Sequence, residues 1–226
     1  MGRSMKKILS ILALVALPLS AFSEQGLYIQ LQGNKVFPMD TDASANLGSL
    51  NGKPLVLNGE VEYDDSFTAG VEIGMKGIGD TNFRAGIQFM QPEFEFVKAT
   101  GTSLTYDGVD YTVQGSISRS DLDPNNIIDA DARMLMINGY YDFAGHWESF
   151  VPFVGLGVGM VDFDRASDKE AAAAVMLGFK KYVTDSKQLY IGHKSSFTRV
   201  KGPEVSGVNF DDVDFYTATF QLGYEF

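Results

Sequence analysis

The 226-residue sequence predicts an all-β fold, an eight-stranded antiparallel transmembrane β-barrel with long extracellular loops and short periplasmic turns. Three observations lead to this prediction. The chain begins with the pattern of an export signal. The rest contains eight segments in which large apolar residues alternate with polar or small ones. The connections between these segments are alternately longer and shorter, as expected for strands that cross a membrane up and down.

Residues 1–23 have the layout of a cleaved signal peptide. Three basic residues precede an apolar run at 8–19, and the small residues Ala21 and Ser23 suit a cleavage site before Glu24. The apolar run is shorter than the roughly 20 residues of a membrane-spanning helix, which argues against an anchor that stays attached. We therefore expect one mature domain, the β-barrel of residues 24–226.

The composition of the mature domain excludes several classes of function. The signal holds three of the 18 basic residues and none of the 29 acidic ones, so the mature net charge is −14. This charge argues against nucleic acid as a partner. The chain has no cysteine, so disulfides and thiol chemistry are excluded.

The alternation assigns one uncharged face to every predicted strand. A Lys or Arg facing the middle of a bilayer would cost about 2–4 kcal/mol, which explains why no charge occurs on this face. We expect the face to point outward, into lipid. Its residues are Leu27, Ile29 and Leu31; Phe67, Ala69, Val71, Ile73 and Met75; Phe83, Ala85, Ile87 and Phe89; Leu135, Ile137 and Tyr141; Val154, Leu156, Val158 and Met160; Val175, Leu177 and Phe179; Leu189 and Ile191; and Tyr216, Ala218, Phe220, Leu222, Tyr224 and Phe226.

The connections provide a second test of the strand assignment. Every second connection is short, as expected when both chain ends lie on the periplasmic side. The segment 166–179 leaves an alternative open, because it also fits a helix capped by Ser167. In chain order the connections are 33–66, 77–81, 92–131, 144–150, 164–170, 184–187 and 200–212.

Aromatic residues gather at the predicted periplasmic ends of the strands, where their rings would lie at the level of the lipid headgroups. A soluble β-sandwich or lipocalin-type barrel would also show alternation. We favour a transmembrane barrel over these soluble folds because glycines and charges share one face of the predicted strands. The expected aromatic girdle consists of Tyr141, Phe143, Trp147, Phe150, Phe153, Tyr182, Tyr190, Tyr224 and Phe226.

The C-terminal segment TATFQLGYEF places Phe220, Leu222, Tyr224 and Phe226 at two-residue steps. This ending resembles the insertion signal of bacterial outer-membrane barrels, which the barrel assembly machinery reads. The stretches MLMINGYYDF, PFVGLGVGM and VMLGFKKYVTDSKQLYIG resemble the opacity-protein and OmpA-like superfamily of eight-stranded barrels. The resemblance implies a bacterial outer-membrane location with both termini periplasmic, and contact with outer-membrane lipid and lipopolysaccharide.

The lumen of such a barrel is just wide enough for side chains or one small ligand. The polar residues predicted to fill it are Glu72, Arg84, Gln88, Lys180, Gln221 and Glu225. We expect Glu72, Arg84, Lys180 and Glu225 to form a charge network that closes a polar interior, although a narrow polar passage is the alternative. Folding about the turn 77–81, centred near residue 79, would make Glu72 and Arg84 diagonal neighbours.

The loops 33–66 and 92–131 are then the candidate sites for an extracellular ligand. An Asp-Gly turn in YDGVDY, residues 106–111, predicts a hairpin in the second loop. Acidic residues are frequent in both regions, but their spacing does not match a calcium loop. We expect a structural or surface-interaction protein without a metal or cofactor, and the alternative is a small porin-like or hydrophobic-solute channel.

One motif raises the question of catalysis. His193 and Ser195 lie two residues apart, on one face of a strand, and faintly resemble the His and Ser of outer-membrane lipid A deacylases. The chemistry needs a third, acidic residue, and only Glu204 is nearby in sequence. Ser196 also stands where that family has Asn. A lipid A-modifying hydrolase is therefore the least favoured alternative, and we do not expect an enzyme.

Overall fold

The computed structural model describes residues 26–78, 81–119, 130–143, 149–164, 166, 168–205 and 208–226. The predicted signal peptide, residues 1–23, and the girdle residue Trp147 lie outside the described residues. All the named elements are β-strands, and the described part contains no helix long and apolar enough to cross a membrane.

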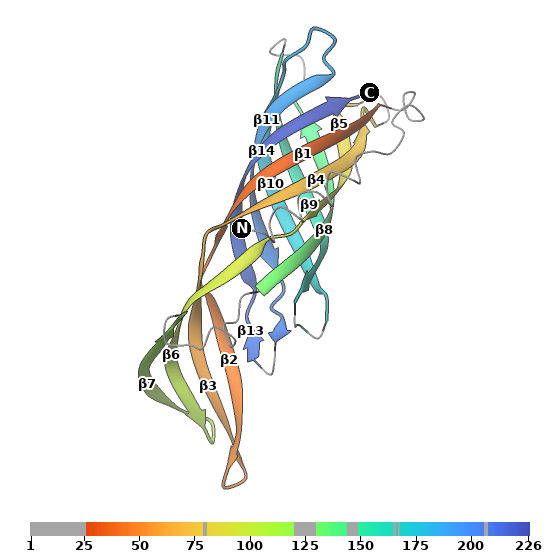
Figure 1. The fold of residues 1–226 in the computed structure, drawn as a ribbon. Coiled ribbons are helices and arrows are strands. Elements are labelled where there is room, and N and C mark those ends of the chain that lie inside the picture. The colour runs from red at the N-terminus through yellow and green to blue at the C-terminus, as the bar shows by residue number, and fades with distance from the viewer. Residues whose placement is uncertain are drawn as a thin grey trace.

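Eight strands form a closed antiparallel barrel (Figure 1). Each strand pairs with the next one along this series, and β1 pairs with β14 to close the barrel. Closure leaves no unpaired barrel edge, which a strand structure in lipid requires. The predicted fold class is confirmed. The strands are β1 (Leu27–Pro38), β4 (Ser66–Lys76), β5 (Phe83–Met90), β8 (Ala130–Asp142), β9 (Phe150–Phe163), β10 (Glu170–Tyr182), β11 (Leu189–Val200) and β14 (Val213–Glu225).

The outer wall of the barrel is apolar, as the alternation predicted. Leu156, Leu177 and Ile137 are 68%, 63% and 61% exposed, although a soluble barrel would bury such residues. The helix alternative for 166–179 is wrong, because β10 covers most of this segment. Of its four consecutive alanines, Ala172 and Ala174 face inward, which suits the crowded lumen of a small barrel.

The strand ends that the three short connections join lie at one end of the barrel, which we call the turn end, together with Leu27 and Phe226. The strand ends that the longer connections join lie at the opposite end, which we call the loop end. Hydrogen bonds from Phe226 N to Leu27 O and from Lys76 N to Gly26 O tie the two ends of the described chain to the turn end.

The predicted loops 33–66 and 92–131 are largely strands, which corrects the expectation of loops. Together with β12 and β13 from the connection 200–212, they form a sheet that projects from the loop end in the order β7-β6-β3-β2-β13-β12 (Figure 1). Strand β6 also pairs briefly with β8. We call it the loop-end sheet. Its strands are β2 (Thr41–Leu50), β3 (Lys53–Asp64), β6 (Glu93–Tyr106), β7 (Val109–Ser118), β12 (Glu204–Val205) and β13 (Val208–Phe210).

Two hairpin turns build this sheet. The predicted turn at Asp107–Gly108 joins β6 to β7, with φ of 54° and 76°. A second turn at Asn51–Gly52, with φ of 52° and 77°, joins β2 to β3. Both have the two left-handed residues of a type I′ turn, for which Asn-Gly and Asp-Gly are preferred. The Asn-Gly dipeptide was therefore a readable signal that the sequence analysis missed.

The predicted aromatic girdle needs one correction. Phe153 and Tyr190 point into the lumen, where they are 2% and 1% exposed, and the Tyr182 hydroxyl also turns inward to Glu225. These three residues occupy the same alternate positions of their strands as the glycines and the charged residues, and those positions face the lumen. The outward ring pairs at the turn end are Phe83–Tyr141, Tyr141–Phe143, Phe150–Phe179 and Tyr224–Phe226.

Candidate functional site

In the described part of the chain, three acidic and three basic side chains are buried in the lumen, and the partly exposed Lys76 adds a further cation at its turn end. The structure places all four predicted network residues in the lumen. Asp142 and Lys194 complete the set and were missed, although the parity of their strands pointed to the lumen. The six residues are Glu72, Asp142, Glu225, Arg84, Lys180 and Lys194.

The first charge cluster lies at the turn end. Glu225 accepts hydrogen bonds from Lys180 Nζ and Lys76 Nζ, both at 2.7 Å, and from Tyr182 Oη at 2.9 Å. Lys180 Nζ also lies 2.9 Å from Asp142 Oδ2. Lys180 of β10 therefore links β14 to β8, each of which is separated from β10 by one strand of the barrel.

Arg84 joins this cluster rather than pairing directly with Glu72. Its Nη2 donates to Asp142 Oδ1 at 3.3 Å, and its guanidinium lies 4.3 Å from the Tyr140 ring centroid and 5.0 Å from that of Tyr28. The predicted register was wrong, because Glu72 lies opposite Gln88, so the turn is centred at residue 80 instead of 79.

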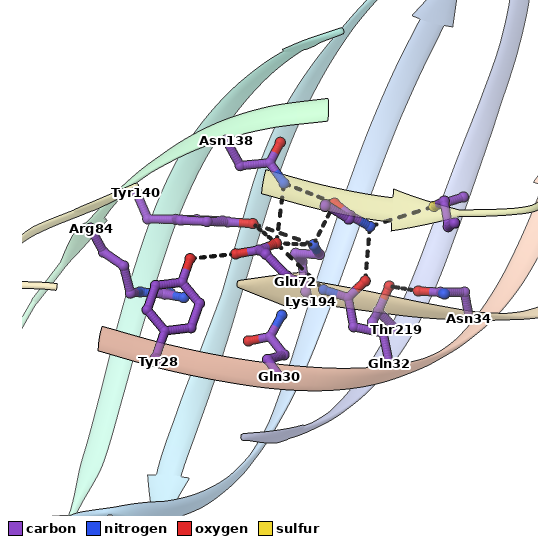
Figure 2. Close-up of polar contacts among 12 residues, drawn as sticks. Tyr28, Gln30, Gln32, Asn34, Glu72, Arg84, Asn138, Tyr140, Lys194 and Thr219 are labelled. Atoms are coloured by element: carbon purple, nitrogen blue, oxygen red, sulfur yellow. Dashed lines mark hydrogen bonds and ion pairs between the residues drawn. The ribbon is translucent and has the colours of Figure 1, made fainter. Parts of the chain in front are cut away.

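Glu72 is the centre of a second cluster of polar side chains (Figure 2). Its carboxylate accepts hydrogen bonds from Tyr28 Oη at 2.6 Å, Tyr140 Oη at 2.7 Å and Asn138 Nδ2 at 3.1 Å. Lys194 Nζ lies 3.6 Å away and supplies the opposite charge. The two tyrosines thus contact Glu72 through their hydroxyls and Arg84 through their rings, and so lie between the two charges.

Amide side chains extend the network toward the loop end (Figure 2). Gln88 donates to Gln32 at 2.8 Å and accepts from Asn138 at 2.8 Å and from Lys194 at 3.2 Å. These contacts connect four strands of the barrel. Hydrogen bonds of this kind satisfy most of the buried polar groups, which would otherwise oppose folding.

Glycines make room for the large side chains of the network. A Cβ at Gly86 would overlap Tyr28 and Glu72, and a Cβ at Gly155 would lie 2.5 Å from the Tyr140 ring. Real Cβ atoms do not approach other atoms so closely. At Gly86 and Gly155, the side chains that fill the lumen therefore pack directly against the backbone of the barrel wall.

The loop-end half of the lumen is apolar, which corrects the expectation of a polar interior throughout. Side chains from seven of the eight barrel strands, together with Phe94 of β6, fill it. At these strand ends the inward residues are apolar and many outward ones are charged, such as Lys35, Arg133 and Arg199, so the polarity of the two faces is reversed relative to the middle of the strands. The cluster consists of Val36, Met90, Phe94, Ala132, Met134, Met136, Val161, Phe163, Ala172, Ala174, Val200, Val213 and Phe215.

This apolar cluster continues onto the inner face of the loop-end sheet. The Phe94 ring centroid lies 5.7 Å from that of Phe215 inside the barrel and 6.1 Å from that of Tyr63 on β3. Tyr63 shares its face of β3 with Leu57, whose partners across β2 and β6 are Ala45 and Leu104. One face of the sheet is therefore apolar and runs into the lumen.

The opposite face of the loop-end sheet is polar. Ser44, Asn58 and Ser103 lie side by side on it. On the same face, Lys98 donates to Glu62 at 2.9 Å, and this hydrogen bond raises the pKa of the Lys98 ammonium group. The two faces thus differ in polarity over the same strands.

His193 and Ser195 lie on the outward face of β11, with His193 Nε2 3.0 Å from Ser195 Oγ. The strand neighbours of His193 are Phe179 and Phe220, and neither can orient an imidazole as a carboxylate does. Glu204 lies on β12 of the loop-end sheet. The described residues also contain no group of three His, Cys, Asp or Glu that could hold a metal ion.

No protein-family model and no curated protein matches the chain. Among solved structures, Neisserial surface protein A aligns over 88% of this chain and 97% of its own, with a TM-score of 0.51 and 12% identity. OprG of Pseudomonas aeruginosa aligns over 89% and 96%, with a TM-score of 0.47 and 16% identity. The first likeness shows the fold: the chain is an eight-stranded β-barrel of the bacterial outer-membrane type.

Proposed function

We propose that this chain is a bacterial outer-membrane protein whose barrel is a closed anchor and whose loop-end sheet makes contacts outside the cell. The observation that supports this most directly is the contrast between a filled lumen and an uncovered apolar sheet face. The proposal assigns no catalysis to the chain. It places both termini in the periplasm and the loop-end sheet on the cell surface.

The filling of the lumen supports the anchor role. A solute moving along the barrel would have to separate the Glu225–Lys180 and Glu72–Lys194 pairs and then pass the apolar cluster. Breaking a buried ion pair typically costs about 3–5 kcal/mol, so the closed state is favoured.

The loop-end sheet supports the contact role. In the described part of the chain it is a single layer of strands, and Val109, Tyr111 and Ile117 on β7 are each more than half exposed. An exposed apolar surface of this kind is typical of interaction sites. The predicted loop ligand thus becomes a partner of the sheet formed by residues 41–64 and 93–118.

Assembly and lipid contacts belong to the same proposal. Phe220, Leu222 and Tyr224 point outward on β14, as the insertion-signal reading requires. We assign Phe220, Leu222, Tyr224 and Phe226 to contact with the barrel assembly machinery, and the apolar outer wall to contact with outer-membrane lipid and lipopolysaccharide.

The orientation can be tested because the chain has no native cysteine. Thr112→Cys places a thiol on the loop-end sheet, and Ser186→Cys places one in an exposed turn at the other end. A membrane-impermeant maleimide should label the first in intact cells and the second only after lysis. Labelling of Ser186→Cys in intact cells, or recovery of the protein from the soluble periplasm, would reject the proposal.

The contact role needs its own test. The triple variant Leu57→Ser, Leu104→Ser, Tyr111→Ser makes the apolar sheet face polar and leaves the barrel intact. Cells displaying it should partition less into hexadecane and attach less to epithelial monolayers than cells displaying the native chain at equal surface level. Equal behaviour in both assays would remove the contact role.

A second candidate function is the uptake of hydrophobic solutes, and one observation favours it. The apolar face of the sheet reaches the apolar cluster of the lumen through Phe94. Nanodiscs holding the protein would then bind the neutral fluorophore 1-aminoanthracene, and Phe94→Asp would abolish this binding. If the native protein does not bind the fluorophore, solute uptake is rejected and the contact role is the only proposed function that remains.

A further inference from the structure

The outer wall of the barrel, which the proposed function assigns to general lipid contact, carries a groove that could hold a particular lipid. Its volume is about 440 Å³, and it crosses β9, β10, β11, β14 and the loop-end part of β1. Its floor consists of Ser195 and Ala218, which are direct neighbours across β11 and β14. Small side chains at this point leave the wall hollow between larger neighbours.

Large residues form the sides of the groove. Phe197 and Tyr216 stand toward the loop end, with ring centroids 5.1 Å apart, and Phe37 lies beside Tyr216 on β1. Leu177 and Val154 continue the groove on the other side of the floor. The lining carries no charge, so the groove suits an apolar chain.

The register determines the direction of the groove. Val154, Leu177, Ser195, Ala218 and Lys35 are neighbours in one row across five strands. Val154 is only four residues from the turn-end limit of its strand, whereas Lys35 is eight residues from that of β1. The row therefore rises from the turn end toward the loop end as it approaches Lys35.

Lys35 gives the upper end of the row a positive charge. Its Nζ lies 4.6 Å from the Phe37 ring centroid and 3.0 Å from Asp65, and its side chain is 37% exposed. An exposed ion pair of this kind contributes little stability, so an anion of higher charge can replace Asp65 as the partner.

We propose that this groove binds a phosphorylated membrane lipid from the leaflet at the loop end. One acyl chain lies along the row, over Ala218 and Ser195, and the phosphate lies beside Lys35. The membrane itself supplies this ligand, since the groove opens on the apolar belt of the barrel. The inference rests on the membrane insertion proposed above.

Native mass spectrometry of the detergent-solubilised protein can test the site. The probe is dipalmitoylphosphatidic acid, and dipalmitoylglycerol serves as the control lipid without a phosphate. We expect one phosphatidic acid to be retained, with about tenfold weaker binding after Ala218→Phe, which fills the groove. Ser195→Leu should have the same effect and replaces Ala218→Phe if that variant does not fold.

Two further variants make the outcome specific. Lys35→Gln should weaken binding of phosphatidic acid and leave that of dipalmitoylglycerol unchanged. Ile137→Phe adds a ring to the outer wall on β8, outside the groove, and should change neither. Equal retention by folded groove-filling variants and the native protein would overturn the proposal, as would equal native affinity for the two lipids. Failure of membrane insertion itself would be recognised separately, by fractionation.

Discussion

Lys180 Nζ and Glu225 Oε1 lie 2.7 Å apart inside the turn end of the barrel. They join β10 to the last strand, and a second contact of Lys180, to Asp142, extends the link to β8. Both side chains of the pair are almost fully buried. Glu225 is thus part of a charge cluster that joins five strands around the lumen, because Lys76 of β4 and Arg84 of β5 also belong to it.

Removing Lys180 should destabilise the barrel. Lys180→Met leaves Glu225 with Lys76 and Asp142 with Arg84, so we expect a loss near the lower end of the typical 3–5 kcal/mol for a broken buried pair. Thermal unfolding followed by circular dichroism in detergent measures this loss. The matched control is Lys181→Met on the exposed face of β10, which should leave the melting temperature within a few degrees of the native value.

Glu72→Ala should both destabilise the barrel and admit water. It removes the acceptor for Tyr28, Tyr140 and Asn138 and leaves Lys194 buried without its carboxylate, which is typically costly. Planar-bilayer recordings should show a closed native protein and small, fluctuating conductance in the variant. A native protein that conducts steadily would contradict the closed lumen. Glu60→Ala, on the polar face of the loop-end sheet, should change neither measurement.

The lumen should reject side chains at its glycine positions. A Cβ at Gly157 would meet Asn138, Met136 and Met176, so Gly157→Leu should prevent closure of the barrel. Gly139 faces outward with no atom within 4 Å of an added Cβ, and Gly139→Leu should fold normally. The measurement is the shift in gel migration between unheated and boiled samples, which a closed barrel shows. Folding of both variants would show that the lumen is looser than described.

The terminal aromatic should matter more for assembly than an exposed aromatic elsewhere. Phe226→Asp interrupts the outward series with Tyr224 and Leu222, and we expect its outer-membrane level to fall several-fold. Tyr111→Asp changes an exposed aromatic ring on the loop-end sheet and should assemble at the native level. Normal assembly of Phe226→Asp would end the insertion-signal interpretation.

The sequence by itself predicted which side of each barrel strand faces lipid. The period of two is a local property, so apolar Leu156 and Leu177 could be placed outward and Glu72 and Lys180 inward without knowing any pairing. An uncharged outward face on every strand indicates strands that cross a bilayer, and such strands must close into a barrel. The same pattern therefore also predicted the closed barrel. Its limits were reached at strand ends such as Met134–Met136, where both parities are apolar.

Only the tertiary structure decided which inward charges meet. A change of one residue in the centre of the turn between β4 and β5 moves the partner of Glu72 from residue 86 to Gln88. Arg84 pairs with Asp142 because β8 lies beside β5 with Tyr140 opposite Arg84. Glu72 meets Lys194 because closure of the barrel brings β11 to the level of β4 in the lumen. The row of outward neighbours from Val154 to Lys35 also rises toward the loop end because of the register between strands. Such contacts depend on the stagger of all eight strands, and no local period of the sequence carries that information.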